Sequence, residues 1–214
     1  IQDHDATKNN YGVVADHPEL MDINFMRGPS ADWLHGNAID YNPELDQILL
    51  SPRFVNELWI IDHSTTSAGL AENMGRIAAE KGVYFCDVPV SGGQQGAING
   101  QLSLMAGCDS EAYETLCQIT APYTKAIAHM GPVGAGQKTK MVNQICVAGL
   151  IQALAEGVHF AQQNDLDVGK VMALVGQGAA SSWQLQNRHE TMHKGEYDHG
   201  FAVDLMHKDL QICL

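Results

Sequence analysis

The sequence predicts an α/β domain followed by an all-α domain, and two observations support this prediction. Between residues 58 and 130, short apolar runs alternate with segments of helical spacing, which is the pattern of an α/β sheet. After residue 136 the pattern is helical throughout, and its first stretch would form a helix about 40 Å long at about 1.5 Å per residue. A helix of that length often links two domains. We therefore expect one domain over residues 1–136 and a second over residues 137–214.

The first strand of the pattern follows an irregular segment. Residues 1–57 are polar and lack clear periodicity. Residues 58–62, by contrast, form a short apolar run that ends in a polar cluster, which indicates a buried strand. Residues 67–81 then have the spacing of an amphipathic helix, which Gly82 ends. The apolar face of this predicted helix comprises Leu70, Met74, Ile77 and Ala78.

Three further strands and one further helix complete the predicted α/β domain. The strands cover residues 83–90, 102–106 and 126–130, and the helix covers residues 109–119. The segment between the first two of these strands is too short to hold a crossover helix, so we expect a loop there and a sheet of mixed direction. The glycines of this loop are Gly92, Gly93, Gly96 and Gly100.

The rest of the chain predicts the all-α domain. Its first helix covers residues 137–164, and shorter helices follow over residues 168–175, 181–191 and 204–214. We expect the last helix to be cut off at Leu214, so that this domain is truncated at its C-terminus. Because a long apolar helix seldom stays uncovered, we also expect a homo-oligomer, either a dimer or a tetramer.

The composition argues against some classes of partner. The formal net charge of −13 makes the surface acidic, and an acidic surface repels nucleic-acid phosphates and anionic lipids. No apolar run approaches the roughly 20 residues that span a bilayer, and the first residues lack the basic start of a signal peptide. We therefore expect neither nucleic acid nor a membrane as a partner.

The cysteines and histidines do not lead us to expect a disulfide framework or a metal site. The five cysteines are scattered without a C-x-x-C pair, which fits reduced thiols in a cytoplasm. The ten histidines are spread along the chain, and although His189 and His193 have the H-E-x-x-H spacing, we do not infer a metal site from this pair alone. We expect a cytoplasmic protein without a metal site.

A glycine-rich segment follows the strand predicted over residues 83–90. Ser91, Gly92 and Gly93 come directly after it. Glycines let backbone N–H groups approach a ligand closely, and a run of such amides forms a concavity that binds anions. A substrate carboxylate would suit this place, although an ordinary glycine-rich turn would have the same composition.

A second motif opens the long predicted helix. The stretch GPVGAG leads into it, and Lys140 and Asn143 share one helix face because they are three residues apart. An ammonium and an amide on one face can hold a substrate oxygen together. The ammonium can also act as a general acid toward a carbonyl or stabilise developing alkoxide charge. The alternative is a solvated surface lysine, which is the usual fate of a lysine on a helix.

Two shorter motifs complete the set. Thr65 lies in a Ser/Thr cluster at the C-terminal end of the strand over residues 58–62, and ligands bind at this edge of open α/β sheets. The same cluster also suits a helix N-cap. Lys208 is followed by Asp209, and this pair belongs either to a site or to a solvated ion pair of little energetic value.

Together these four motifs resemble those of the β-hydroxyacid dehydrogenase family, which includes 3-hydroxyisobutyrate and tartronate semialdehyde dehydrogenases. The resemblance runs in the family's order from about residue 60 to residue 214. It implies a Rossmann-like cofactor domain over residues 1–136, a substrate and dimerisation domain over residues 137–214, and NAD or NADP as the cofactor. The segments similar to the family's substrate-binding, catalytic, C-terminal and nicotinamide-ribose motifs are DVPVSGGQQGAINGQLSLMAG, GPVGAGQKTKMVNQ, FAVDLMHKDL and IDHSTTS.

The resemblance also implies a role for each candidate residue at the substrate. Lys140 would act as the general acid in reduction and as the base in oxidation. Asn143 would anchor the substrate beside it. The residues that would hold the substrate carboxylate are Ser91, Gly92 and Gly93.

The remaining roles concern the cofactor and the choice of substrate. Thr65 would contact the cofactor, and Lys208 would lie beside the nicotinamide or the substrate. Hydride would pass directly between the nicotinamide and a small 3-hydroxy acid such as 3-hydroxyisobutyrate, serine or tartronate semialdehyde. The segment that contains Trp183 is most similar to the branch acting on 3-hydroxyisobutyrate-like acids and serine, and this tryptophan would either wall the substrate pocket or belong to the core.

Residues 1–57 depart from the family. The family begins with a G-x-G-x-x-G fingerprint, whereas this segment contains only Gly12, Gly28 and Gly36, none of them in that pattern. The start of the Rossmann-like domain is therefore incomplete or divergent, and the acidic residue that would distinguish NAD from NADP is missing from its expected place. One alternative to an active dehydrogenase is a truncated, non-catalytic remnant that binds carboxylates or dimerises. A second, an imine reductase, is disfavoured because such relatives usually replace the lysine that is present here as Lys140.

Overall fold

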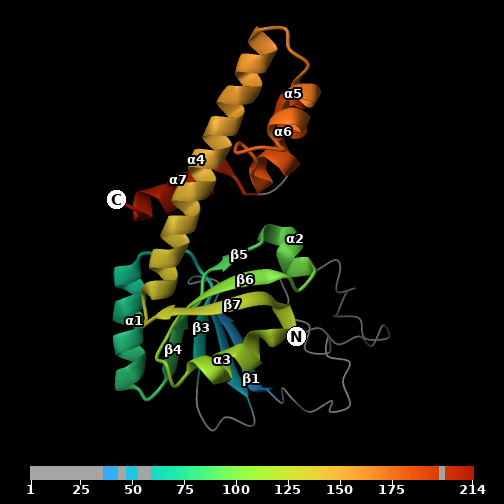
Figure 1. Ribbon diagram of the computed structural model, residues 1–214. Helices are drawn as coiled ribbons and strands as arrows, with labels where there is room; N and C mark the ends of the chain where they lie inside the picture. The colour runs from blue at the N-terminus through green and yellow to red at the C-terminus, as the bar shows by residue number, and fades with distance from the viewer. Residues whose placement is uncertain (1–35, 43–46, 53–58, 198–200) are drawn as a thin grey trace, which may run out of the picture. The chain divides into compact units, whose positions relative to one another are not determined.

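Residues 36–42, 47–52, 59–197 and 201–214 are described by the computed structural model of the 214-residue chain (Figure 1). The chain divides into two units, residues 1–138 and residues 139–214. Strands and helices alternate in the first unit, and the described elements of the second are all helices. The predicted fold class, an α/β domain followed by an all-α domain, is therefore confirmed.

The first unit is built on a mixed sheet. Its seven described strands follow the order β1-β2-β3-β4-β6-β5, and β7 pairs with β6. The pairs β3–β4 and β6–β7 are parallel and the other pairs are antiparallel, which confirms the predicted mixed direction. The strands are β1 (Gly36–Asn42), β2 (Gln47–Pro52), β3 (Trp59–Asp62), β4 (Tyr84–Asp87), β5 (Val90–Ser91), β6 (Leu102–Gly107) and β7 (Thr124–Gly131). The helices are α1 (Ala68–Glu80), α2 (Gly93–Ile98) and α3 (Tyr113–Thr120), and a 3₁₀ turn, η2 (Ala121–Tyr123), follows α3.

Two strands lie within the segment that we expected to be irregular. β1 pairs with β2, and β2 pairs with β3. Without β2, this edge of β3 would present an unpaired row of N–H and C=O groups, each of which needs a hydrogen-bond partner. The expectation of irregular structure up to residue 57 is therefore wrong for β1 and β2, and the rest of residues 1–57 lies outside the described residues.

Helix α1 confirms the predicted helix and part of its predicted buried face: Ala78 is buried and Met74 packs against the same cluster. Leu70 and Ile77, which we placed on the apolar face, are both exposed. Alanines form the buried face, and two of them, Ala71 and the predicted Ala78, pack with Phe85 in a small hydrophobic cluster beside the sheet. Small side chains let the helix backbone approach the strands closely, so they can fill this face without a large apolar residue. The buried alanines are Ala68, Ala71 and Ala78.

The segment after β5 contains a helix where we expected a loop. Gly92 and Gly93 have φ angles of 139° and 61°, which side-chain-bearing residues rarely adopt. The chain can therefore turn sharply out of β5 and directly into α2. The glycines of this segment thus mark a tight turn and a short helix.

The strand predicted over residues 83–90 is divided into β4 and β5. Pro89 lies at the break, and its missing N–H cannot contribute to a strand ladder. The N–H of Val88 instead donates to the carbonyl oxygen of Asp62 at 2.7 Å. This bond holds the end of β4 beside the end of β3.

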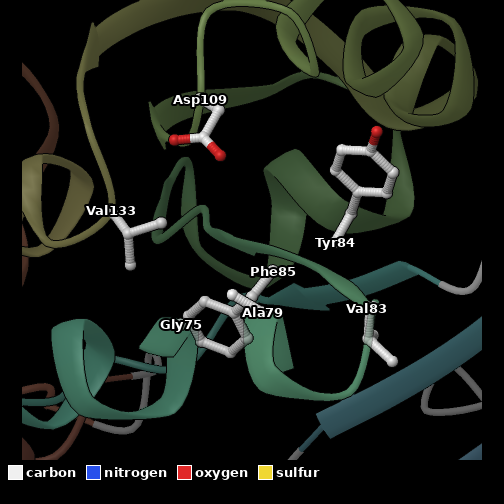
Figure 2. Close-up of a pocket in the computed structure, with 8 residues that line it drawn as sticks. Gly75, Ala79, Val83, Tyr84, Phe85, Asp109 and Val133 are labelled. Carbon is white, nitrogen blue, oxygen red and sulfur yellow. The ribbon is translucent and has the colours of Figure 1, made fainter. Parts of the chain in front are cut away.

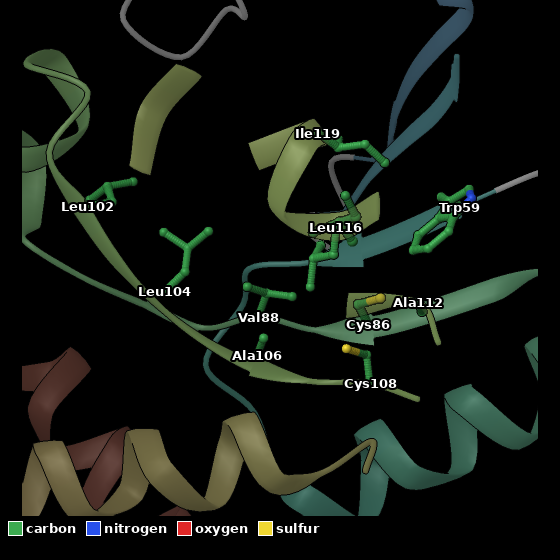
Figure 3. Packing of buried hydrophobic residues seen from close by; sticks show 11 residues of the cluster. Trp59, Cys86, Val88, Leu102, Leu104, Ala106, Cys108, Ala112, Leu116 and Ile119 are labelled. Carbon is green, nitrogen blue, oxygen red and sulfur yellow. The ribbon is translucent and has the colours of Figure 1, made fainter. Parts of the chain in front are cut away.

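The main core of the first unit lies among β3, β4, β6 and α3 (Figure 3). Trp59 of β3 stacks on Tyr84 of β4 with ring centroids 4.7 Å apart. Most of the other core side chains are aliphatic, and two are cysteines. The buried members are Trp59, Ile61, Cys86, Val88, Leu102, Leu104, Ala106, Cys108, Ala112, Leu116 and Ile119.

The second unit contains four helices among its described residues. The longest, α4, begins in the last residues of the first unit. Its later turns pack against α5 and α6 in a separate core, whose buried members are Leu154, Val158, Ala161, Val168, Met172 and Leu185. The helices are α4 (Ala135–Gln163), α5 (Val168–Val175), α6 (Trp183–Lys194) and α7 (Val203–Ile212).

Helix α4 is the described element that bears on the expectation about membrane-spanning runs. Among the described residues it is the one helix long and apolar enough to cross a membrane by length and composition, although core helices of soluble proteins meet the same criterion. We expected no apolar run of that length. Polar residues interrupt the apolar residues of α4, so it contains no continuous apolar run of that length. Its mean hydropathy still meets the criterion.

Candidate active site

The loop after β3 is held in one conformation by Gln137. The Gln137 side chain donates from Nε2 to the carbonyl oxygen of Ser64 at 2.8 Å and accepts the N–H of Thr66 at Oε1 at 3.1 Å. Asp62 holds the start of the same loop, because its Oδ1 accepts both the N–H and the hydroxyl of Ser64. Thr65, the predicted cofactor contact, therefore lies between two residues whose backbone is fixed by a fully buried amide.

Asp87 forms the centre of the first unit's polar interior. Its Oδ1 accepts the N–H of Gly134 at 2.7 Å, and its Oδ2 accepts the N–H of Gln137 at 2.8 Å. Burial raises the pKa of this carboxyl to about 6, whereas the two N–H donors lower it. At neutral pH the ionised carboxylate thus holds the N-terminal end of α4 beside the end of β4.

The predicted carboxylate-binding residues lie at the turn from β5 into α2. Ser91 is half-buried, and Gly92 and Gly93 are exposed. A Cβ on Gly92 would come within 3.1 Å of the Leu102 side chain, so the turn has little room for a larger residue. Their role in binding a substrate stays a prediction.

Lys140 is buried in α4, where a solvated lysine was the alternative. Its relative exposure is 8%. Burial lowers the pKa of its ammonium, because a charged group loses hydration there; the nearby Asp209 carboxylate raises this pKa, and the nearby Lys208 ammonium lowers it. A lysine with a lowered pKa can give up and take back a proton more readily near neutral pH than a solvated one.

A hydrogen-bonded network links α4 to α7 within the second unit. The amide of Asn143 donates to Gln144 Oε1 at 2.7 Å, and Gln144 Nε2 donates to Asp209 Oδ2 at 2.6 Å. Lys208 Nζ lies 3.0 Å from Asp209 Oδ1, which has no hydrogen bond, so this contact is an ion pair only. Asn143 and Lys208 come from sequence motifs 65 residues apart. The structure connects them through Gln144 and Asp209.

The ion pair of Lys208 and Asp209 is not the solvated pair that was the alternative. Lys208 is exposed, but Asp209 is 3% exposed and bonded to a buried glutamine. A buried carboxylate requires such partners, because an unpaired charge away from water is costly. Asp209 therefore belongs to the polar interior of the second unit, and Lys208 pairs with it from the exposed side.

Trp183 is not a core residue. It is 60% exposed at the start of α6, and the guanidinium of Arg188 lies 5.1 Å from the centre of its ring. Its place in a substrate pocket stays a prediction.

Two cavities in the described part of the chain are lined by residues other than the predicted site residues. A cavity of about 250 Å³ lies between α1 and β4, with the Asp109 carboxylate as its charged group (Figure 2). It is lined by Gly75, Ala79, Gly82, Val83, Tyr84, Phe85, Asp109 and Val133. In the second unit a more apolar hollow of about 470 Å³ is lined by Ile145, His207, Leu210, Gln211, Cys213 and Leu214. In the described part of the chain no cluster of three metal-ligating side chains occurs.

Three polar residues of the candidate site, and the burial of a fourth, Asp209, were missed by the sequence reasoning. Asp87, Gln137, Gln144 and Asp209 are all buried and hydrogen-bonded. Each lies inside a motif that the sequence analysis had already selected. The available signal was a polar side chain at a position that the packing of a strand or helix is expected to bury. Burial itself, however, depends on neighbours that are distant in the sequence.

Two family descriptions match successive parts of the chain. Residues 40–131 match the NAD-binding domain of 6-phosphogluconate dehydrogenase. Residues 134–214 match the family described as NAD-binding of NADP-dependent 3-hydroxyisobutyrate dehydrogenase. The break between the two matches falls just before α4.

Related proteins include several oxidoreductases. An uncharacterized oxidoreductase of Shewanella frigidimarina is 49% identical over 155 residues, which cover 72% of this chain and 53% of that protein. A probable 3-hydroxyisobutyrate dehydrogenase-like 1, mitochondrial, of Arabidopsis thaliana is 37% identical over 155 residues, which cover 72% of this chain and 46% of the relative. The chain spans about half the length of the curated relatives that it matches.

A solved structure of similar fold is that of Mycobacterium tuberculosis 3-hydroxyisobutyrate dehydrogenase with L-serine. It is 27% identical and superposes with a TM-score of 0.67, over 72% of this chain and 56% of that one. The two family matches cover the segments that contain all of the predicted site residues.

Proposed function

Because the chain belongs to the β-hydroxyacid dehydrogenase family, of the 3-hydroxyisobutyrate dehydrogenase-like type, we propose that it is an NAD(P)-dependent oxidoreductase that acts on a small 3-hydroxy acid. The observation that carries this proposal is the buried Lys140 in the segment that resembles the family's catalytic motif. Its lowered pKa suits a group that must exchange a proton with the substrate oxygen at neutral pH.

The residues around the β3 loop fit the nicotinamide end of the cofactor. Ser64 and Thr66 are fixed by Gln137, which holds Thr65 at the C-terminal edge of a parallel strand pair. Ligands of open α/β sheets bind at this edge. Residues 1–57 contain no G-x-G-x-x-G pattern, so no residues of this chain are proposed to hold the cofactor's diphosphate.

The bound cofactor supplies a hydride acceptor or donor at the nicotinamide ring, and the chain supplies proton transfer and placement. In oxidation, Lys140 Nζ takes the proton of the substrate hydroxyl; in reduction, it returns a proton to the carbonyl oxygen. Asn143, tied to Gln144, holds the same oxygen in reach. Burial lowers the pKa of Lys140, and repulsion from the Lys208 ammonium lowers it further.

We propose a small hydroxy-carboxylic acid as the substrate. Ser91, Gly92 and Gly93 would bind its carboxylate through the hydroxyl and the backbone N–H groups at the β5–α2 turn. The choice of 3-hydroxyisobutyrate or serine follows from the resemblance of the segment around Trp183 and from the similar structure that contains L-serine.

The test is formation of NADH or NADPH with 3-hydroxyisobutyrate, serine and 4-hydroxybutyrate. For Lys140→Ala we expect kcat to fall by roughly 10²–10⁴-fold, the usual contribution of a general acid or base. Lys138→Ala is the matched control: this lysine lies two residues away on the same helix, is exposed and pairs with Glu72. Full activity in Lys140→Ala would contradict the assigned role.

A second candidate function is a non-catalytic remnant of the fold, and the missing glycine fingerprint in residues 1–57 favours it. Calorimetric titration with NAD and with NADP separates the two functions. Micromolar binding of either cofactor would exclude the remnant, and absence of binding together with absence of turnover would exclude the dehydrogenase.

We also propose that the chain forms a homo-oligomer. Several large apolar side chains of α4 are exposed, and exposed apolar surface of this kind favours association. Light scattering on the purified chain tests this, with a monomer as the contradicting result. The exposed side chains are Val142, Ile145, Leu150 and Phe160.

A further inference from the structure

We propose that Asp87 is a positioning residue, whose ionised carboxylate fixes the first turn of α4 and thereby the place of Lys140 on that helix. This inference rests on the proposed function, in which Lys140 is the catalytic group. Asp87 itself touches neither substrate nor cofactor in this proposal. It acts through the backbone of α4.

Asp87 supplies from a strand the two bonds that a helix start normally receives from its own side chains. The N–H groups of the first helical residues lack partners within the helix. In a capping box, the residue before the helix and the third helical residue satisfy each other's N–H groups with their side chains. Here the residue before α4 is Gly134, which has no side chain. Asp87 accepts the N–H groups of both Gly134 and Gln137.

The carboxylate has no room to adopt another position. A Cβ added to Gly107 of β6 would come closer to Asp87 Oδ1 than any real contact allows, and a Cβ added to Gly136 of α4 would meet Asp87 Oδ2 at 2.8 Å. Two glycines therefore form the walls of its pocket. A capping carboxylate exposed to solvent would not need two glycines packed against it. The close packing therefore favours a single position for the Asp87 carboxylate and for the helix start that it binds.

Few charges face this carboxylate. Asp62 on β3 is the charged group that raises its pKa, and the thiols of Cys86 and Cys108 lie close enough to sense its charge. Across the helix start, Lys138 of α4 pairs with Glu72 of α1. None of the ion pairs among the described residues includes Asp87, so its charge is balanced by the two N–H groups and the positive end of the helix dipole.

This placement matters for Lys140 because of helix geometry. Gln137 precedes Lys140 by three residues on the same helix, and each residue advances the helix by about 1.5 Å. If the first turn unwinds or shifts by one residue, the direction of the next turn's side chains changes with it. A displacement of about 1 Å at a reacting group can lower a rate by about a hundredfold.

The test compares Asp87→Asn with the unaltered chain at pH 7.5. Asparagine keeps the shape but presents an NH₂ group to one of the two N–H donors. We expect kcat to fall at least tenfold while KM changes less than threefold. The acid limb of the kcat profile near pH 6 should disappear, because the group that titrates there is gone. The free energy of unfolding should change little, since one lost hydrogen bond is offset by removal of a buried charge.

Leu116→Ala is the matched control, because Leu116 is fully buried in the first unit's core and belongs to no site. It should lower stability without changing kcat or the pH profile. The proposal is overturned if Asp87→Asn keeps both its kcat and the acid limb, or if Leu116→Ala loses kcat to the same extent.

Amide hydrogen exchange at Gln137 separates this inference from the proposed function. If the unaltered chain has no dehydrogenase activity, the proposed function fails. Faster exchange of the Gln137 amide in Asp87→Asn would still support the positioning role of Asp87. Equal exchange in both proteins would overturn it. Should Asp87→Asn not fold, Asp87→Ala is the second variant, with the same expected outcomes.

Discussion

Gln144 of α4 and Asp209 of α7 are joined by a 2.6 Å hydrogen bond between two buried side chains. This bond connects the segment that contains Lys140 to the segment that contains Lys208. The Asp209 carboxylate thus interacts with both lysines: it pairs with Lys208 and raises the pKa of Lys140. The charge of Asp209 is therefore expected to control the protonation of Lys140.

Asp209→Asn should lower the pKa of Lys140 further. The Asp209 carboxylate raises this pKa by favouring the charged ammonium, so its removal leaves burial and Lys208 unopposed. The limb of the kcat/KM profile that belongs to Lys140 should move to lower pH. The control is Asp204→Asn, an exposed position of α7. A limb that stays in place or moves upward would contradict the electrostatic role of Asp209.

Lys208→Ala should shift the same limb in the opposite direction. Lys208 lowers the pKa of Lys140 by repulsion, so neutralising it should raise that pKa and move the limb to higher pH. Lys194→Ala, which removes an exposed lysine of α6 that lies near Glu190, serves as the control and should leave the profile unchanged. Identical profiles for Lys208→Ala and the unaltered chain would show that this cation does not act on Lys140.

The free energy of unfolding should fall as the pH rises from about 4 to about 6. Burial raises the pKa of Asp87 to about 6 from its ordinary 3.8, so the folded chain binds this proton more tightly than the unfolded chain does. Stability is then highest below the unfolded pKa and decreases through the folded one. The loss is on the order of 3 kcal/mol, at about 1.4 kcal/mol per pKa unit. Urea unfolding of the chain and of Asp87→Asn at several pH values measures it, and equal pH slopes would refute the assignment.

Gly136→Ala and Gly149→Ala should have opposite effects on stability, although both lie in α4. A Cβ at position 136 would press on Asp87 and on the carbonyl oxygen of Met105, and overpacking of this kind costs about 1–3 kcal/mol. A Cβ at position 149 would meet nothing within 4 Å, so the gain in helix propensity of up to about 1 kcal/mol remains. Thermal unfolding of both variants decides the point; a stabilised Gly136→Ala would show that the Asp87 pocket is not tightly walled.

Much of the fold could be predicted because the local pattern was strong. The apolar runs at β3, β4, β6 and β7 and the long helix α4 each carry their own periodicity. The order of the four motifs likewise needed no tertiary information, since each motif is contiguous in the sequence. The helix α2 was missed because its glycines mark a turn equally well, and only the backbone angles of Gly92 and Gly93 distinguish the two.

The sequence by itself determined the alternation of strands and helices, the family resemblance and the candidate residues Lys140, Asn143 and Lys208. Only the tertiary structure decided which polar groups are buried. Leu70 is exposed although it is apolar, and Asp87 and Asp209 are buried although they are charged. The physical reason is that burial and pKa depend on groups 47 or more residues away, such as Gly134 for Asp87 and Gln144 for Asp209. No local pattern contains those contacts, and they are what turns a lysine on a helix into a candidate acid and base.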